Sequence, residues 1–283
     1  MSASPTISVL PPLSSRRKVA YCLATAALTV ALLLPLVLLD RPPQSPRLTF
    51  IGVGEGLSIL VEGAGGGRVL IGGGATQSDL PAALGRQLRP WDTMVDLVLV
   101  TDRRDLPGAT ELVRRGRVRA AAVVGLSEER AAAAALVALR ESCAARGVPV
   151  RDIVADERIA VGRDADMALD VLLSPGDAQN PTLRLVAGTF TATVISGATL
   201  TREPTLGAIL LRPGQEPYRA AFAAEPRLLV ATARPDLPDD RVPVDRQLLL
   251  IAPGARTTLT IEGASWRVRG AGLVPLESVP VRR

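Results

Sequence analysis

An uncharged stretch near the N-terminus has the length and composition of a membrane-spanning helix. Residues 19–39 carry no charge, and about 21 residues is the length of a helix that crosses a bilayer. A cleavable signal peptide has a shorter apolar region and small residues at its cut site, which residues 38–41 (Leu-Leu-Asp-Arg) lack. The basic triplet at 16–18 favours a cytoplasmic N-terminus. The sequence therefore predicts a single-pass plasma-membrane protein whose C-terminal domain is extracytoplasmic.

This membrane segment sets the domain boundaries. Residues 1–18 are predicted to be a disordered cytoplasmic tail, since they are rich in Ser, Pro and Thr. Residues 19–39 form the predicted transmembrane helix, and the proline-containing residues 40–46 form a short linker. Residues 47–283 are long enough for one core of roughly 230 residues, without a second domain.

After the linker, strand patterns alternate with helix patterns and then give way to strands alone. Strands are expected at 47–53, 57–62, 68–71, 95–101 and 118–124, with helices at 79–88, around 110–115, and from a Ser127 cap to Gly147. The second half predicts strands at 168–173, 183–187, 191–195, 207–211, 228–231, 248–252, 257–262 and 266–269. This order predicts an α/β (α+β) fold in which two sheets pack together with helices outside, an αββα sandwich.

The chain has no histidine, which removes several reaction classes at once. Imidazole is the commonest metal ligand and the usual acid/base group near neutral pH. A Ser-His-Asp or Cys-His centre is excluded, and a Ser-Lys centre is excluded because the only lysine, Lys18, adjoins the membrane segment. Cys22 and Cys143 lie far apart in the sequence and are interpreted as small apolar fillers.

Several segments together resemble a known family. Residues 48–62 read Leu-Thr-Phe-Ile-Gly-Val-Gly-Glu-Gly-Leu-Ser-Ile-Leu-Val-Glu, and residues 69–74 read Val-Leu-Ile-Gly-Gly-Gly. Residues 96–101, 180–186, 193–197, 228–233 and 258–263 follow with matching strands and turns. In this order and spacing they resemble the metallo-β-lactamase-fold domain of ComEC-type competence proteins. The resemblance covers essentially everything after the linker and implies the same sandwich, here preceded by one transmembrane helix.

The resemblance also locates the positions at which that family carries its metal ligands. In this chain those positions hold Gly52, Leu57, Gly72, Asp102, Arg104, Asp105, Leu106, Ala198, Thr232 and Ala233. Of these, Asp105 alone keeps the family's residue type. A two-metal hydrolase needs its ligands to hold cations that activate water, so we expect no metal, no cofactor and no catalytic residue. A magnesium site built from Asp102 and Asp105 remains the alternative, because magnesium accepts oxygen ligands.

The expected function follows from two observations: the strands and turns match the family, and the metal-ligand positions do not. The chain is interpreted as a membrane-anchored pseudoenzyme that acts as an interaction or scaffold module, with an unknown protein partner and a link to DNA uptake. The alternative is a metal-dependent hydrolase or phosphodiesterase at Asp102 and Asp105. Nucleic acid is a further candidate partner, since arginines cluster at 103–104 and 114–119, although this region has no aromatic residue for stacking on bases.

Overall fold

The computed structural model describes most of the chain after the linker and a short part before it. The described residues are 20, 22–31, 44–53, 56–74, 77–88, 93–126, 130–162, 167–174, 177–195, 207–211, 228–231, 247–251, 254–262, 265–270 and 273–275. The chain divides into two compact units, Met1–Pro42 and Pro43–Arg283.

In the first unit, residues 22–31 are helical. Two hydroxyls bond back to the helix backbone: Thr25 Oγ1 donates to the Cys22 carbonyl at 3.0 Å, and Thr29 Oγ1 donates to the Thr25 carbonyl at 2.8 Å. Within the described part of the chain, no helix is both long and apolar enough to cross a membrane. Residues 32–39 of the predicted transmembrane helix lie outside the described residues, so that helix stays a prediction.

The second unit begins with an eight-stranded sheet. Its strands in spatial order are β15 (Ser265–Gly270), β14 (Arg256–Glu262), β1 (Arg47–Val53), β2 (Gly56–Glu62), β3 (Arg68–Ile71), β4 (Val95–Val100), β5 (Val118–Val124) and β6 (Val150–Ile153). β3 to β6 run parallel, and the C-terminal hairpin joins the sheet by pairing β14 with β1. The near-continuous apolar sequences of β1 and β4 suit strands covered on both faces.

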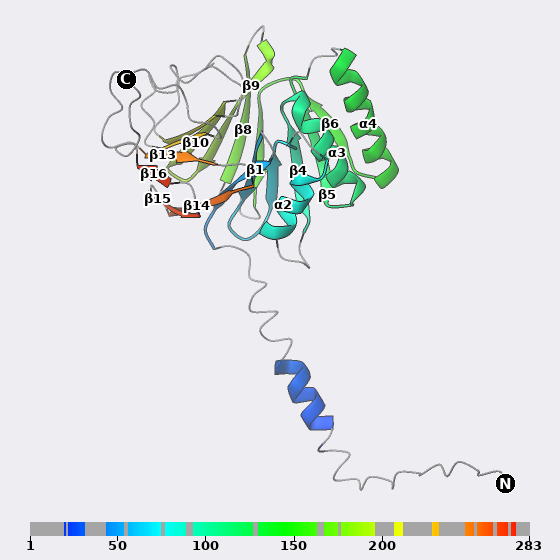
Figure 1. Ribbon diagram of the computed structural model, residues 1–283, viewed down its shortest axis with the longest axis vertical. Coiled ribbons are helices and arrows are strands. Elements are labelled where there is room, and N and C mark those ends of the chain that lie inside the picture. The colour runs from blue at the N-terminus through cyan, green and yellow to red at the C-terminus, as the bar shows by residue number, and fades with distance from the viewer. Residues whose placement is uncertain are drawn as a thin grey trace, which may run out of the picture. The chain divides into compact units, whose positions relative to one another are not determined.

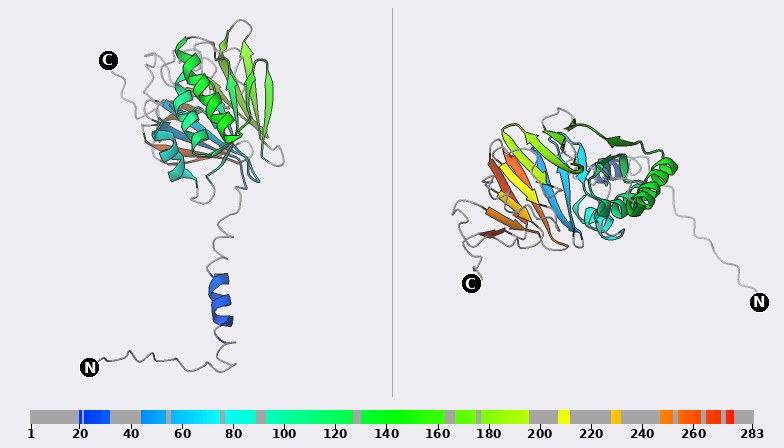
Figure 2. Two further views of the ribbon diagram at one scale, coloured as in Figure 1. Left: turned by 90° about the vertical axis from the view of Figure 1, so that its right-hand side faces the viewer. Right: turned by 90° about the horizontal axis from the view of Figure 1, so that it is seen from above.

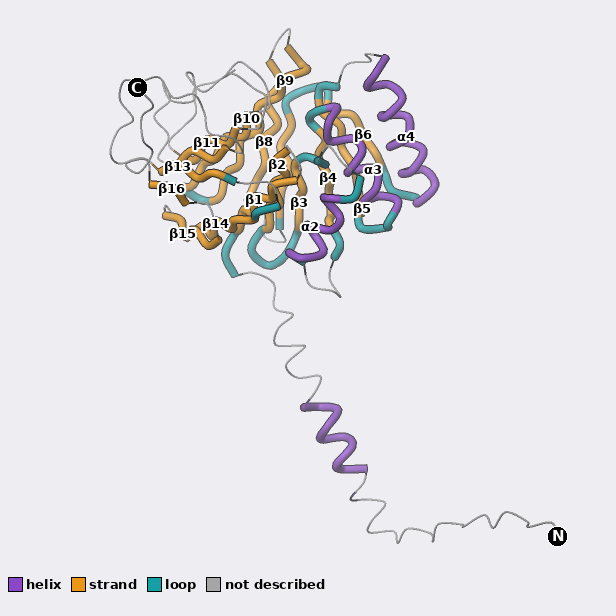
Figure 3. The backbone as a smooth tube through the Cα atoms, in the orientation of Figure 1, coloured by secondary structure: helices purple, strands orange, loops and turns teal. Residues whose placement is uncertain are grey.

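Three helices cover one face of this first sheet: α2 (Asp79–Gln87), α3 (Leu106–Arg114) and α4 (Arg130–Arg146). Figure 3 shows all three on the same side of the strands. A buried apolar layer joins them to the sheet and includes Leu60, Leu84, Leu112 and Leu139. Cys143 lies buried in this layer, and burial raises the pKa of its thiol, as fits a small apolar filler.

A second eight-stranded sheet packs against the other face of the first. Its spatial order is β16 (Leu273–Pro275), β13 (Gln247–Leu250), β12 (Leu228–Ala231), β11 (Gly207–Leu211), β10 (Phe190–Ile195), β9 (Asp177–Ala187), β8 (Met167–Ser174) and β7 (Glu157–Val161). The core between the sheets is almost wholly aliphatic, with Leu48, Leu57 and Ile59 from one sheet facing Leu169 and Leu185 from the other. Figures 1 and 2 show the helices, the first sheet and the second sheet as successive layers.

The predicted two-sheet α/β sandwich is confirmed, and nearly every predicted strand is present within a residue or two at each end. β9 is longer than predicted, because it begins at Asp177 and not at 183. Three strands were not predicted: β6, β7 and β16. α3 also begins earlier than expected, at Leu106. The cap predicted at Ser127 and any helix on the outer face of the second sheet lie outside the described residues.

The strand directions give the first sheet two distinct ends. The loop edge is the end where β1, β3 and β4 finish, and it carries residues 52–53, 72–74 and 101–105. The entry edge is the opposite end, where the chain enters the sheet at Arg47 and where β3, β4 and β5 begin. In open α/β sheets, ligands bind beyond the carboxyl ends of the parallel strands, so the loop edge is where a site is expected.

Candidate functional site

The end of β1 contributes a backbone junction to the loop edge. The Gly52 N–H donates to the Ala255 carbonyl at 3.0 Å, and the Gly52 carbonyl accepts from the Gly254 N–H at 3.0 Å. Gly52 lies directly opposite Leu57 on β2. Leu57 is 1% exposed and belongs to the core between the sheets. At both positions, where the resemblance expected carboxylates, the chain offers no side-chain oxygen.

The turn after β3 packs directly onto the segment that leads into α3. The Gly72 N–H donates to the Leu99 carbonyl at 2.9 Å, and Gly72 has a φ of +83°, which disfavours a side chain there. A Cβ at Gly73 would lie 1.8 Å from the Asp105 carbonyl oxygen, and one at Gly108 would lie 1.7 Å from the Gly73 carbonyl oxygen. The two segments therefore meet backbone to backbone.

The loop after β4 is a short 3₁₀ helix, η1 (Arg103–Asp105), capped by its own carboxylate. Asp102 Oδ1 accepts a hydrogen bond of 2.8 Å from the Arg104 N–H, and the Asp105 N–H donates to the Asp102 carbonyl at 2.9 Å. Asp102 is half-buried, whereas Arg103 and Arg104 are exposed. The carboxylate of Asp102 thus fills the usual role of an N-cap, which satisfies an otherwise unbonded backbone donor.

Asp105 and Leu106 are placed in the interior at the start of α3. Asp105 is 2% exposed and Leu106 is fully buried in the layer between α3 and the first sheet. Thr110 Oγ1 donates to the Leu106 carbonyl at 2.7 Å one turn later. Leu106 stands where the resemblance expected a metal-binding histidine, and here it is part of the hydrophobic packing.

The structure brings together seven of the ten positions identified from the sequence: Gly52, Leu57, Gly72, Asp102, Arg104, Asp105 and Leu106. The other three, Ala198, Thr232 and Ala233, lie outside the described residues. Among the residues that the structure describes, no group of three or more His, Cys, Asp or Glu side chains is placed to hold a metal ion. The donors that the described residues supply therefore do not by themselves fit a two-metal hydrolase centre, which requires several nitrogen or oxygen ligands around each cation.

The arginines that cluster in the sequence do not form one surface. α3 spans nine residues, or about 13 Å along its axis, and separates Arg103 and Arg104 from the arginines that follow it. Arg103 and Arg104 lie at the loop edge, while Arg114 and Arg117 lie at the entry edge. Sequence spacing alone did not reveal this separation, although the helix prediction at 110–115 pointed toward it.

Comparison with known proteins gives similarities of fold. No protein-family model matches the sequence, and no curated protein does either. Among solved structures, the chain is similar to Igni18, a metallo hydrolase from Ignicoccus hospitalis, with 11% identity, a TM-score of 0.45, and 77% of this chain and 100% of that chain covered. It is similar to a metallo-β-lactamase from Pontibacter korlensis, with 19% identity, a TM-score of 0.34, and 52% and 63% covered. It is also similar to a long-form RNase Z from yeast, with 10% identity, a TM-score of 0.45, and 75% and 41% covered.

These likenesses concern the fold at low identity, and they say nothing of catalysis in this chain. The two-sheet sandwich is shown by the strand order of this chain itself, and the resemblance to the metallo-β-lactamase-fold domain of ComEC-type proteins stays a prediction from the sequence. The chemistry of the site is accordingly interpreted from this chain's own residues.

Proposed function

We propose that this protein is a membrane-anchored, non-catalytic domain of metallo-β-lactamase-like fold that serves as an interaction or scaffold module. One observation carries the proposal: the loop edge has a continuous backbone framework, but four of the seven described positions where the resemblance places metal ligands hold glycine or buried leucine. Gly52, Leu57, Gly72 and Leu106 offer no side-chain donor, and the carboxylate of Asp102 caps a helix.

The physical reason is the demand that hydrolysis makes on its ligands. A pair of metal ions lowers the pKa of bound water and stabilises the developing negative charge, so removing the ligands removes the nucleophile. Without histidine the chain lacks the commonest general base near neutral pH. A fold that persists without these groups is better suited to presenting a surface than to breaking a bond.

The finer parts of the proposal concern where the module acts. We place the N-terminus in the cytoplasm, residues 19–39 across the plasma membrane, and the sandwich outside it, on the length of the uncharged run and the basic triplet before it. The ComEC-like order of turns leads us to propose a protein partner in DNA-uptake or competence machinery. Protease accessibility of the sandwich in intact cells and in inverted vesicles tests the orientation.

Elemental analysis of the purified full-length chain in detergent tests the central claim. We expect less than stoichiometric zinc, manganese and iron, and no hydrolysis of a phosphodiester substrate when manganese or zinc is added. Stoichiometric transition metal that survives dialysis would contradict the proposal. Metal content and hydrolysis are measured on the same preparation, so that an enzyme that lost its cation during purification is not mistaken for an inactive protein.

The second candidate function is an oxygen-ligated hydrolase at Asp102 and Asp105. The observation in its favour is that both carboxylates belong to one turn at the loop edge, and magnesium is bound by carboxylates and water. If it holds, magnesium-dependent hydrolysis is present and is abolished by Asp102→Asn and by Asp105→Asn. Asp152→Asn is the matched control, because that carboxylate is exposed on β6 and bonded to Arg140.

A further inference from the structure

The two sheets have four edge strands, and β15 is the longest of them. β15 has six residues, whereas β6, β7 and β16 have four, five and three. Figure 1 shows β15 beside β14, at the margin of the first sheet. An edge strand presents backbone N–H and C=O groups that can pair with a further strand. Among the strands that the structure describes, none pairs with the outer side of β15.

The charges on β15 are balanced less completely than those on β6. On β6, Asp152 is bonded to Arg140 of α4, and Arg151 is bonded to Glu157 of β7. On β15, no carboxylate of the described residues forms an ion pair with Arg269. Charged side chains discourage unspecific pairing at a sheet edge. A positive charge without a partner goes further, because it selects a strand that brings negative charge.

The hydrogen bonds of β14 determine which residues of β15 face the free side. The Ile261 N–H donates to the Pro46 carbonyl at 2.9 Å, so Ile261 directs its backbone groups toward the β1 side. In an antiparallel sheet, successive residues direct these groups to opposite sides, so Thr260 directs its own toward β15, where it pairs with Arg267. The neighbours of Arg267 then direct their N–H and C=O groups to the free side; these are Trp266 and Val268.

The side chains of β15 alternate between two faces of the sheet. Trp266 and Val268 are half-buried and pack against the core between the sheets. The ring of Trp266 meets that of Phe190 edge to face, with 5.8 Å between centroids. Arg267 and Arg269 are exposed, and they lie on the opposite face because side chains in a strand alternate.

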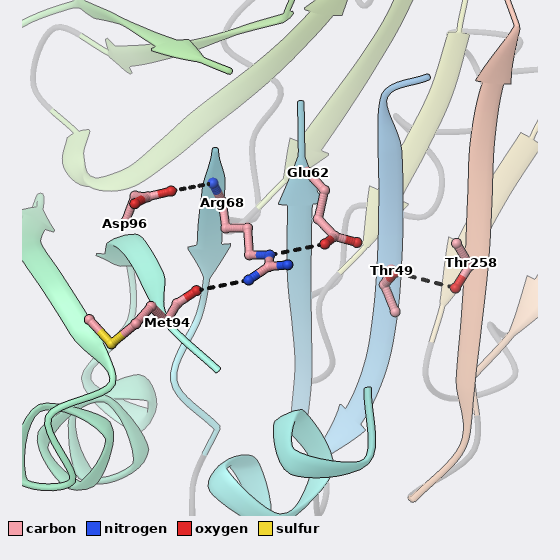
Figure 4. A network of polar contacts seen from close by, with 6 residues as sticks. All are labelled: Thr49, Glu62, Arg68, Met94, Asp96 and Thr258. Atoms are coloured by element: carbon pink, nitrogen blue, oxygen red, sulfur yellow. Dashed lines mark hydrogen bonds and ion pairs between the residues drawn. The ribbon is translucent and has the colours of Figure 1, made fainter. Parts of the chain in front are cut away.

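The face that carries these arginines continues across β14 and β1. Arg269 is in register with Thr258, and Figure 4 shows the side chains of Thr258 and Thr49 pointing toward each other. Arg47, two residues before Thr49, is exposed on the same face. Among the described residues, no carboxylate forms an ion pair with Arg47 or Arg269. The free edge therefore combines unpaired backbone groups, a half-buried apolar rim and surplus positive charge.

We propose that β15 binds an extended segment of a protein partner as an added strand, in which acidic side chains alternate with apolar ones. This inference deepens the proposed function, on which it rests, by naming the chemistry of the partner. Backbone bonds to Trp266 and Val268 hold the segment, its carboxylates lie opposite Arg267 and Arg269, and its apolar side chains extend the rim of the core. Arg267 also pairs with Glu262 at 3.2 Å, but a guanidinium has five donors and can serve both carboxylates.

A second copy of this chain does not suit the edge. The antiparallel registers that pair most of the strand place Trp266 opposite Val268, or Val268 opposite Val268. The first register places Arg267 opposite Arg267, and the second places Arg267 opposite Arg269. Like charges directly opposite each other destabilise a pair of strands, which favours an acidic partner over a second copy.

The experiment measures binding of dye-labelled synthetic peptides to the purified full-length chain in detergent, by fluorescence anisotropy. One peptide has eight residues in which glutamate and valine alternate. A second has the same composition with the four glutamates before the four valines, and a third alternates lysine and valine. We expect the alternating acidic peptide to bind at least roughly tenfold more tightly than either of the others, because only it matches both faces of β15.

Val268→Pro tests whether binding uses the free backbone edge. This change removes an N–H on the outer side of β15 and leaves the charges and the bonds to β14 in place, a position at which proline is tolerated. We expect the affinity for the alternating acidic peptide to fall by roughly tenfold or more. Val268→Ala keeps the N–H and is the matched control, for which the fall should be less than about threefold. Circular dichroism checks that both variants are folded.

Reversing the charge tests which side chains select the partner. The double change Arg267→Glu and Arg269→Glu should transfer the preference to the lysine peptide. Arg103→Glu with Arg104→Glu is the matched control at the loop edge, and it should leave the acidic preference unchanged.

Hydrogen exchange of the unmodified chain gives a measurement that needs no variant. The amides of Trp266 and Val268 should exchange faster than the amide of Arg267, and the alternating acidic peptide should slow them. Slow exchange at both amides in the free chain would overturn the inference, because another segment would then already cover the edge.

Equal binding of the two acidic peptides would also overturn the inference, as would unchanged binding in a folded Val268→Pro variant. A single-stranded oligonucleotide that binds Val268→Pro as tightly as the unmodified chain and displaces the peptide would instead indicate a phosphate-binding surface. Stoichiometric transition metal would contradict the non-catalytic assignment and leave the peptide result standing, so the two failures are distinguishable.

Discussion

The two ends of the first sheet are built by different physical means. At the entry edge, charged side chains on neighbouring strands are paired, as in Glu62–Arg68 and Asp96–Arg119. At the loop edge, where a hydrolase would keep its charged ligands, the contacts are between backbone atoms of glycines, with buried leucine beside them. Charged pairs therefore join neighbouring strands at the entry edge, whereas the charged residues of the loop edge, 102–105, lie in the loop after β4.

Under the proposed function, this difference is what a fold that lacks a metal site would show. Metal ligands are held by side chains, and replacing them with apolar residues removes buried charge that would otherwise need partners. The loop edge nevertheless has a close-packed turn, because Gly73 and Gly108 let the loop after β3 contact η1 and the start of α3 backbone to backbone. If the comparison is right, substitutions that add atoms at the loop edge and substitutions that remove charge at the entry edge should both lower the free energy of unfolding.

The largest expected effect is that of Gly73→Ala. The new Cβ would lie 1.8 Å from the Asp105 carbonyl oxygen, so the two loops must separate. We expect a loss of about 3 kcal/mol or more in the free energy of unfolding. Chemical denaturation of the purified full chain in detergent, followed by circular dichroism, measures it.

Gly147→Ala is the matched control for that change. Gly147 has a φ of +65°, but nothing lies within 4 Å of the added atom, so the cost should be only about 1 kcal/mol, from backbone strain. If the two variants lose equal stability, the close contact between the loops is not what holds the loop edge together.

Leu57→Ala tests the packing of a leucine at a position where the sequence resemblance places a metal ligand. Leu57 is 1% exposed in the core between the sheets, and shortening it should cost about 3 kcal/mol through lost burial and a cavity. Val137→Ala is the control, because Val137 is 51% exposed and should change stability by less than about 1 kcal/mol. A Leu57→Ala variant as stable as the wild type would mean that this position is not packed as core.

Much of this fold could be predicted because its strands are apolar on both faces. The run 47–53 lies between Pro46 and Gly54, and the run 118–124 lies between Gly116 and Gly125, so their limits were visible in the sequence and match β1 and β5. The strands that were missed carry weaker signals. β6 reads Val-Arg-Asp-Ile and β7 reads Glu-Arg-Ile-Ala-Val, and both lie at sheet edges, where charged side chains remain in water.

The site was predictable as a set of positions but not as a set of contacts. The order of turns identified Gly52, Gly72 and the loop at 101–105, and the structure places these at one edge. The capping role of Asp102 depends on local backbone geometry, which residue types do not specify. The separation of the arginines by α3 likewise depends on where that helix begins.

At the entry edge, Glu62→Gln should cost about 2 kcal/mol. The side chains of Glu62 and Arg68 are 11% and 17% exposed, so the lost charge leaves a guanidinium poorly solvated. Glu262→Gln is the matched control, because the pair of Glu262 with Arg267 is 44% and 61% exposed and should contribute less than about 1 kcal/mol. Equal losses of stability in the two variants would show that burial of the Glu62–Arg68 pair does not increase its contribution.

The smallest expected effect has the opposite sign. The Ser58 hydroxyl is fully buried in the loop-edge half of β2, and no hydrogen-bond partner for it lies in the described part of the chain. Ser58→Ala should therefore stabilise the protein by up to about 1 kcal/mol. A buried hydroxyl without a hydrogen bond loses its contact with water on folding and gains no interaction in exchange. Thr258→Val is the control: its hydroxyl lies 3.3 Å from Thr49 Oγ1 on the adjacent strand, and its loss should cost about 1 kcal/mol. A destabilised Ser58→Ala variant would instead indicate a bonded hydroxyl, and polar groups at the loop edge would then be satisfied as fully as those at the entry edge.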